Sequence, residues 1–143
     1  MAQQTYVFEA ELVGFRGVRR VIAVHDDLTL VDLHYALQSA FGWDDDHLYA
    51  FWLDGRFWTH TDEHFTRPCA AGDAPDDPSG RSAAIRLDRL GLVPGRSVAY
   101  VFDFGDEWRV NLRVQNVVAA GADASPRLLQ SVGAAPPQYS HAA

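Results

Sequence analysis

The strongest structural signal in the sequence is the segment Leu28-Thr-Leu-Val-Asp-Leu-His-Tyr-Ala-Leu-Gln-Ser-Ala-Phe-Gly-Trp43. Thr29 is a good helix N-cap residue, and Asp32 follows three positions later, as in a capping box. Gly42 suits the position just beyond a helix C-terminus. One apolar stripe runs along the segment at helical spacing, and its members are Leu30, Leu33, Leu37, Ala40 and Phe41. These features predict an amphipathic helix over residues 30–41.

Strand patterns flank this helix on both sides. Residues 6–13 alternate between apolar and polar, and residues 18–24 follow a glycine-containing turn, so the two segments predict a hairpin. Residues 47–53 are rich in strand-forming side chains. Asp54-Gly55 separates them from the aromatic run 56–59, and this arrangement predicts a second hairpin.

A third hairpin is predicted from residues 97–104 and 108–118. We expect Gly105 to take a positive φ in the connecting turn. The carboxylate of Asp106 is expected to hold that turn by accepting a hydrogen bond from a main-chain amide. Trp108 shares one face of its strand with apolar residues, so its ring is expected in the core.

Two segments show the composition of irregular structure. Residues 61–82 hold three prolines, two glycines and five acidic residues, which predicts a long mobile loop. The tail from residue 119 onward is rich in Ala, Pro and Gly and is expected to be irregular. Between them, residues 83–87 are read as a short strand and residues 88–92 as a helical turn.

The expected order is strand, strand, helix, strand, strand, loop, strand, strand, within a single domain over residues 1–143. Separation of the helix from the hairpins indicates an α+β fold rather than a parallel, doubly wound sheet. We therefore expect a roll of mostly antiparallel strands packed on one main helix, similar to a β-grasp arrangement.

The composition excludes several classes of site. Cys69 is the only cysteine, which rules out an intrachain disulfide and any zinc site that needs two or more cysteines. The formal net charge is -7, which disfavours non-specific binding to nucleic-acid phosphates. Arg16, Arg19 and Arg20 form the one basic cluster, and we interpret them as solubilising charges near a sheet edge.

Neither a secretion signal nor an apolar stretch of about 20 residues is visible. The sequence therefore predicts a bacterial cytoplasmic protein that makes no contact with a membrane.

Three motifs carry a resemblance to a known family. The first is residues 32–43, followed by residues 47–51. The second is Tyr100-Val-Phe-Asp-Phe-Gly-Asp-Glu-Trp108, and the third is Pro126-Arg-Leu-Leu-Gln130, followed by residues 133–137. In these motifs the chain resembles the plasmid pRiA4b ORF-3-like family. The resemblance implies an α+β roll, an uncharacterised function and an association with mobile elements.

The chain departs from the family pattern at four positions. Relatives carry His and an acidic residue where this chain has Val110 and Asn111, and they carry Cys and Glu where it has Ala135 and Gln138. These replacements remove titratable and metal-binding groups from any polar site that relatives build there.

Six residues are the best candidates for a binding site, namely Trp43, His47, Asp103, Asp106, Trp108 and Arg109. Asp103 interrupts an aromatic strand with a charge, and we expect it to pair with Arg109 or His47. His34 lies near the apolar stripe of the helix and is expected to be half-buried. No catalytic residue, metal ligand set or cofactor is predicted.

Two short motifs resemble known catalytic signatures without their context. His60-Thr-Asp-Glu-His64 matches the inverted zinc-protease pattern, which needs both histidines on one helix. Here the stretch runs from a strand end into a polar loop, so we interpret the match as a coincidence. Asp103-Phe-Gly105 matches the kinase metal-binding tripeptide, but the chain has no lysine and no glycine-rich loop.

The preferred hypothesis is a non-enzymatic module that binds a protein or peptide partner. It rests on the absence of an intact catalytic constellation and on sheet edges that can accept a strand. The alternative is a metal-assisted hydrolase that uses His47, Asp103 and Asp106. A second alternative is a nucleic-acid-associated accessory protein, which only the family's mobile-element setting suggests. The sequence leaves the partner, the oligomeric state and any catalytic activity open.

Overall fold

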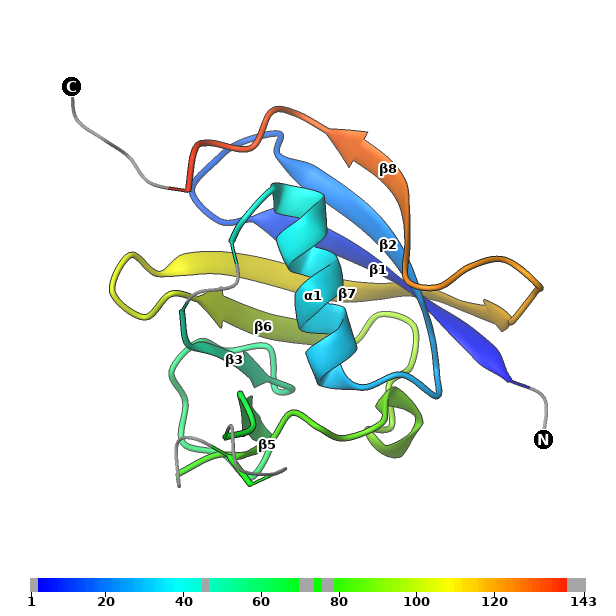
Figure 1. Ribbon diagram of the computed structural model, residues 1–143, viewed down its shortest axis with the longest axis horizontal. Helices are drawn as coiled ribbons and strands as arrows, with labels where there is room; N and C mark the ends of the chain where they lie inside the picture. The colour runs from blue at the N-terminus through cyan, green and yellow to red at the C-terminus, as the bar shows by residue number, and fades with distance from the viewer. Residues whose placement is uncertain (1–2, 45–46, 70–73, 76–78, 139–143) are drawn as a thin grey trace.

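The computed structural model describes residues 3–44, 47–69, 74–75 and 79–138. These residues form one α-helix and an eight-stranded sheet in the order β5-β4-β3-β6-β7-β1-β2-β8 (Figure 1). The strands are β1 (Gln4–Leu12), β2 (Arg19–His25), β3 (Tyr49–Trp52), β4 (His64–Thr66), β5 (Arg81–Ser82), β6 (Ser97–Phe102), β7 (Trp108–Ala119) and β8 (Arg127–Val132). Only the described pair β4–β5 is parallel, so the mostly antiparallel α+β class is confirmed.

The helix α1 (Leu30–Phe41) begins and ends where the sequence predicts. The Thr29 hydroxyl accepts a hydrogen bond from the amide of Asp32 at 3.3 Å, and the Asp32 carboxylate accepts one from the amide of Thr29 at 2.8 Å. Gly42 ends the helix in the left-handed conformation, with φ of 74°. Local capping chemistry therefore sets both ends of this element.

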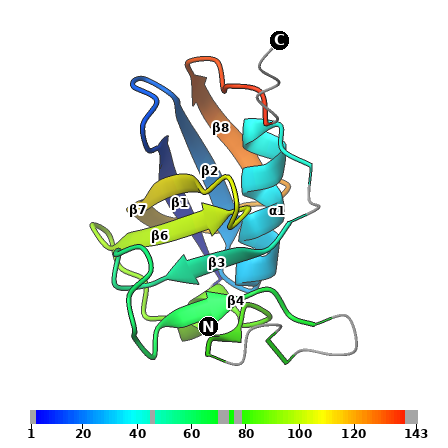
Figure 2. The same ribbon diagram turned by 90° about the vertical axis from the view of Figure 1, so that its left-hand side faces the viewer.

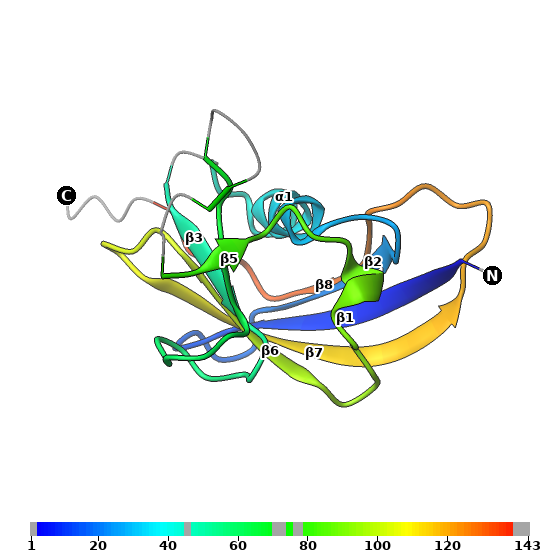
Figure 3. The same ribbon diagram turned by 90° about the horizontal axis from the view of Figure 1, so that it is seen from below.

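The main core lies between α1 and one face of the sheet (Figures 2 and 3). Leu33 and Leu37 from the helix and Phe8 and Val110 from the strands are all fully buried there. Burial of each such side chain contributes about 1.5–3 kcal/mol. The apolar stripe read from the sequence is therefore the surface that holds the helix to the sheet.

Two of the predicted hairpins are confirmed, but the predicted β-grasp-like order is not. β1 pairs with β2 on one side and with β7 on the other, so it joins the first and last hairpins inside a single sheet. The sheet is the dominant element, and the helix covers part of one face.

The predicted hairpin across Asp54-Gly55 is wrong. β3 pairs instead with β4, so residues 54–63 form an excursion between the two strands. The Asp54 carboxylate closes this excursion, because it accepts hydrogen bonds from the amide of Arg56 at 3.0 Å and the hydroxyl of Thr59 at 2.8 Å. Asp54-Gly55 does form a turn, but residues 56–59 after it do not pair with β3.

Two further expectations are corrected by strands in segments that were read as irregular. β4 and β5 lie within residues 61–82, of which residues 70–73 and 76–78 are outside the described part of the chain. β8 lies in the tail after residue 119 and pairs with β2. Residues 83–87 do not form the expected strand, whereas a short 3-10 helix at Leu87–Arg89 matches the expected helical turn.

The excursion covers the face of the sheet that is turned away from α1. A second apolar cluster forms there from Ala50, Trp52, Ala99 and Val101, with Phe57 and Phe104 packed against it. Trp52 is only 1% exposed as a result. The sheet thus carries apolar side chains on both faces in its β3–β6 region.

Two polar side chains are more buried than the sequence indicated. His34 is fully buried under α1, with its Nδ1 at 2.7 Å from the hydroxyl of Tyr100 and its ring stacked on Tyr49. Arg20 is 5% exposed and donates to the carbonyl oxygens of Ala40 at 2.9 Å and Val132 at 2.8 Å. Because β8 covers β2, Arg20 is a buried link between elements and not an edge charge.

Candidate functional site

Four of the six predicted site residues lie together between the C-terminal end of α1 and the turn that joins β6 to β7. Trp43 packs between neighbouring aromatic rings, with ring centroids 5.5 Å from Phe102 and 5.7 Å from Trp108. His47 lies on the other side of this cluster, and its Nε2 is 3.4 Å from Oδ2 of Asp103. The structure therefore brings together Trp43, His47, Asp103 and Trp108, which come from two separate sequence motifs.

Asp103 organises the turn after β6. Its Oδ1 accepts hydrogen bonds from the main-chain amides of Gly105 at 3.1 Å and Asp106 at 3.2 Å. Asp103 and Glu107 have the positive φ values in this turn, at 64° and 52°, and Gly105 does not. The positive φ expected of Gly105 is thus found at Asp103 and Glu107. The turn hydrogen bond expected of the Asp106 carboxylate is accepted instead by Asp103.

The two remaining candidates lie apart from this cluster. Asp106 is exposed at the tip of the turn. Arg109 projects from the opposite face of β7 to Trp108, where its guanidinium lies 5.2 Å from the ring centroid of Phe57 and binds Glu107 at 2.9 Å. Of the two partners expected for Asp103, the structure selects His47 and not Arg109.

The indole N–H groups of Trp43 and Trp108 are buried, and neither finds an acceptor among the described residues. Trp43 is 5% exposed, and Trp108 is half-buried against Phe15 with ring centroids 5.8 Å apart. A buried donor without an acceptor costs about 1–3 kcal/mol. Aromatic packing offsets this cost, so the two tryptophans contribute chiefly to the core.

Three of the four positions that depart from the family pattern have structural roles in this chain. Val110 is fully buried in the main core, and Ala135 packs against it. Asn111 is exposed on the other face of β7. The Gln138 amide accepts a hydrogen bond from the amide of Asp44 at 2.6 Å and donates one to its carbonyl at 3.2 Å. Gln138 therefore fastens the C-terminal segment to the chain just after α1.

The geometry offers no support to a metal-assisted reaction at this cluster. Within the described ranges, no three His, Cys, Asp or Glu side chains are close enough to share a metal ion. Asp106 stays outside the His47–Asp103 pair, and one oxygen of Asp103 is committed to the turn. The cluster is best described as an aromatic junction with the His47–Asp103 contact at its surface.

A different surface, which the sequence did not indicate, lies between α1 and β8. It is a groove of about 280 Å³ lined by Ile22, Tyr35, Ala36, Ser39, Ala40, Pro126, Arg127 and Leu128. Tyr35 on the helix is 53% exposed and Leu128 on the strand is 48% exposed. The helix stripe was visible in the sequence, but the groove depends on β8, which lay in a segment expected to be irregular.

β8 itself is an edge strand with an apolar surface. All six of its residues are exposed, and Leu129 and Val132 are 44% and 37% exposed. β2 is the single strand that pairs with it in the described part of the chain, with a bulge between Val21 and Ile22. Edge strands of soluble proteins usually carry charges that prevent pairing with another chain, and β8 carries one, Arg127.

With an α+β fold of one helix on a mostly antiparallel sheet established, comparison with known proteins identifies the family. The model of the plasmid pRiA4b ORF-3-like protein family matches residues 4–140. The chain therefore belongs to this family, as the motifs around α1 and the β6–β7 turn suggested.

One relative is the uncharacterized protein y4hQ of Sinorhizobium fredii, which is 31% identical over 121 residues. The match covers 85% of this chain and 58% of y4hQ, so the chain spans little more than half the length of that relative. A similar solved structure is the protein of unknown function MM3350 from Methanosarcina mazei, with a TM-score of 0.79 and 22% identity. That match covers 96% of this chain and 74% of MM3350 and supports the fold alone.

These comparisons assign a family and a fold, and neither relative has an assigned activity. In the described part of the chain, no helix is long and apolar enough to cross a membrane. The function proposed below therefore rests on the surfaces of the molecule.

Proposed function

We propose that this protein binds an extended segment of a partner protein, which joins the sheet as an additional strand beside β8. The observation that carries this proposal is an open strand edge with an apolar groove next to it. On an edge strand, alternate residues turn their N–H and C=O groups away from the sheet. An extended peptide satisfies those groups with main-chain hydrogen bonds, and neighbouring pockets select its side chains.

The groove supports a preference for apolar side chains in the partner. Ile22 of β2 lies at its base, Ala36 and Ala40 of α1 form one wall, and Leu128 of β8 forms the other. Alternate side chains of a strand point to the same face of a sheet. Every second side chain of an added strand would therefore point toward the α1 side of β8, where the small alanine side chains leave room.

The charge beside the groove supports an acidic residue in the same partner segment. Arg127 alone is charged among the residues that line the groove. Its guanidinium is 3.3 Å from the carboxylate of Asp123, and both side chains are largely exposed. Such exposed pairs contribute about 0–1 kcal/mol, so Arg127 can exchange Asp123 for a partner carboxylate at little cost. The overall charge of -7 limits the number of acidic residues that the partner can carry.

The length of β8 sets the length of the segment. A six-residue strand extends roughly 20 Å, which corresponds to a peptide of about six to eight residues. The proposed partner is therefore a short, extended, mainly apolar segment with one acidic residue that faces Arg127.

Selection from a library of random octapeptides displayed on phage tests this proposal. We expect an apolar consensus with an Asp or Glu. A synthetic consensus peptide should shift the amide NMR signals of β8 and of the α1 residues that line the groove. Leu128→Glu should weaken binding at least about tenfold, because it places a charge in the groove. Val93→Glu is the matched control, since Val93 is 57% exposed and lies outside the groove.

Three outcomes would contradict the proposal. The first is the absence of any consensus, and the second is a peptide whose binding leaves the β8 signals unchanged. The third is a stable dimer in sedimentation experiments that Leu128→Glu dissociates, because a second copy would then be the natural occupant of the edge. Association with mobile elements and a nucleic-acid role rest on the family alone and receive no additional support from these surfaces.

A further inference from the structure

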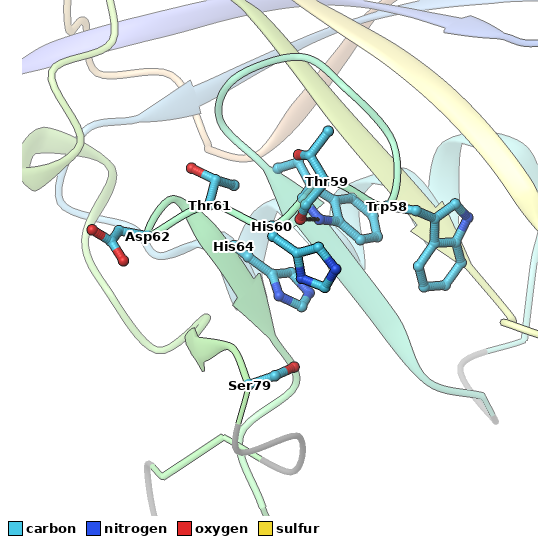
Figure 4. Close-up of a pocket in the computed structure, with 8 residues that line it drawn as sticks. Trp58, Thr59, His60, Thr61, Asp62, His64 and Ser79 are labelled. Carbon is cyan, nitrogen blue, oxygen red and sulfur yellow. Dashed lines mark hydrogen bonds between the residues drawn. The ribbon is translucent and has the colours of Figure 1, made fainter.

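A second cavity lies on the sheet face that is turned away from α1. It has a volume of about 450 Å³ and is lined by Trp52, Trp58, Thr59, His60, Thr61, Asp62, His64 and Ser79 (Figure 4). Pockets for small ligands usually fall in the range of roughly 300–1,000 Å³. This cavity is separate from both the α1–β8 groove and the His47–Asp103 cluster.

The two histidines of the H-x-x-E-H pattern both line this cavity, but the zinc-protease arrangement is not formed. Residues 60–64 enter β4 and form no helix. The Glu63 carboxylate binds the guanidinium of Arg96 at 2.8 Å, so its interaction is with a neighbouring arginine. The H-x-x-E-H segment therefore forms part of a pocket wall and not a helical zinc site.

The inner wall is held in place by stacking. The imidazole of His64 lies parallel to the indole of Trp52, with an angle of 3° and centroids 4.9 Å apart. Gly80 lies close to this pair, because a Cβ there would be 3.3 Å from His64 ring atoms and 2.9 Å from the methyl group of Thr66. The lack of a side chain at residue 80 thus allows the loop to close against the wall.

Trp58 forms a second, exposed wall in a strained conformation. Its φ is 60°, which is unusual for a bulky residue and costs about 1–3 kcal/mol. Its indole Nε1 donates to the Glu107 carboxylate at 2.7 Å, and its ring meets Trp52 and Phe104 edge-on at 5.0 Å. The side chain is nevertheless 43% exposed. The fold therefore holds an aromatic ring in a fixed orientation at the surface.

The carboxylate that holds Trp58 stays charged in mildly acidic solution. The hydrogen bond from Arg109, followed by the one from Trp58, lowers the pKa of Glu107 below its ordinary value. Because the pKa is lowered, the Glu107 carboxylate is still charged when the pH equals the ordinary pKa of a glutamate. The contact with Trp58 weakens only when the pH falls through the lowered pKa.

We infer that this pocket binds a neutral sugar ring, with one ring face on Trp58 and its hydroxyl groups toward the neighbouring Thr59 and His60 (Figure 4). A pyranose has an apolar C–H face and a rim of hydroxyl groups. The negative face of an indole attracts polarised C–H groups. Hydroxyl and imidazole side chains supply donors and acceptors for such a rim of hydroxyl groups.

The lining disfavours other classes of small ligand. Phosphates and carboxylates are disfavoured, because the described lining carries the Asp62 carboxylate and neither Arg nor Lys. A fully apolar ligand would cover the exposed imidazole of His60 without offering it a hydrogen bond. A nucleobase gains most from aromatic rings on both faces, whereas Trp52 is already covered by His64.

Titration of ¹⁵N-labelled protein with neutral sugars tests the inference. The chain has four tryptophans, so four indole N–H signals report on separate places in the fold. The probes are methyl glucoside, methyl mannoside, cellobiose and maltose, with choline and adenosine as other ligand classes. We expect a saturable shift of the Trp58 signal with at least one sugar, while the signals of Trp43 and Trp108 stay in place.

The exposed His60 allows the pocket to be altered without disturbing the core. His60→Ala should weaken sugar binding about three- to tenfold, as expected for the loss of one hydrogen bond. Trp58→Ala should remove binding, and the unchanged signals of Trp43 and Trp108 will show that this variant is folded. Tyr35→Ala is the control, because Tyr35 is an exposed aromatic residue on α1.

The inference is overturned if none of the sugars shifts the Trp58 signal at tens of millimolar concentration. It is also overturned if choline or adenosine shifts that signal and the sugars do not, since the ligand class would then be wrong. Neither result bears on peptide binding at β8, which is measured at different residues.

Discussion

Asp103 shows how one residue serves both a turn and a surface contact. It has a φ of 64° where β6 ends, and its Oδ1 accepts two main-chain hydrogen bonds while Oδ2 faces His47. Aspartate and asparagine tolerate this conformation better than most side chains, because they can bind the main chain that follows. The turn hydrogen bonds therefore explain the presence of Asp103 at the end of an aromatic strand better than its partly exposed contact with His47 does.

Substitution of Asp103 separates these two roles. Asp103→Ala should lower the free energy of unfolding by about 1–3 kcal/mol, because it removes both turn hydrogen bonds and leaves the unfavourable φ. Asp103→Asn keeps an acceptor at the same place and should stay within about 1 kcal/mol of the native protein. Denaturant unfolding followed by tryptophan fluorescence measures both. Equal destabilisation by the two changes would show that the charge, through His47, contributes more than the turn.

The residues of this turn were only partly predictable. The Asp-Phe-Gly-Asp-x-Trp pattern located the turn, but glycine's known freedom pointed to Gly105 as the positive-φ residue. In the structure Asp103 and Glu107 take that conformation. Their side chains are stabilised there by hydrogen bonds to Gly105, Asp106 and Trp58, and a contact to a residue 49 positions away is not visible in a local pattern.

At the scale of elements, the C-terminal end of β8 makes a close approach to the β1–β2 turn. Gly133 has a φ of 75°, and a Cβ at this position would collide with the carbonyl group of Gly17. The carbonyl oxygen of Val132, the residue before Gly133, accepts a hydrogen bond from Arg20 at 2.8 Å. Both contacts hold β8 against β2, beside the groove that is proposed to take a peptide.

Gly133→Ala should therefore loosen β8 while most of the fold remains intact. We expect faster amide hydrogen exchange over residues 127–132, together with unchanged protection in α1 and β6. Gly121→Ala is the matched control, because a Cβ at Gly121 meets no atom within 4 Å. Uniformly faster exchange across the sheet would contradict the prediction, since β8 would then be part of the same cooperative unit as the core.

Elements with a strong local signal were predicted well, and elements that depend on distant partners were not. The helix was predicted from its caps and stripe, and two hairpins from alternation. β4, β5 and β8 are short or fully exposed strands, so their sequences carry little periodic burial. They become strands because a neighbouring strand offers unpaired main-chain groups, which is information that lies elsewhere in the chain.

At the scale of the whole molecule, β8 completes the sheet by covering β2. Val21, Ile22, Ala23 and Val24 of β2 are all buried, with Ile22 only 1% exposed. A chain shortened to residues 1–119 would leave β2 as a long apolar edge and would remove the Val132 partner of the buried Arg20. Such edges pair with other molecules.

We therefore expect the 1–119 protein to aggregate at concentrations at which the full chain stays in solution. Light scattering of refolded samples measures this, and far-UV circular dichroism shows whether α1 still forms. A soluble, monomeric 1–119 protein with a cooperative unfolding transition would contradict the prediction and would show that the segment after residue 119 is dispensable for folding.

The α+β class, the bounds of α1, the β1–β2 and β6–β7 hairpins and the family motifs could all be predicted from the sequence, because capping, alternation and turn chemistry act over a few residues. The sequence also named Trp43, His47, Asp103 and Trp108 as candidates, but their meeting at the aromatic junction is a result of the fold. The position of β8, the α1–β8 groove and the pocket at Trp58 are likewise set by tertiary contacts. These features depend on contacts between distant residues, such as Arg20 with Val132, 112 positions apart. Such contacts leave no periodic pattern, since each is set by packing and not by the neighbouring sequence.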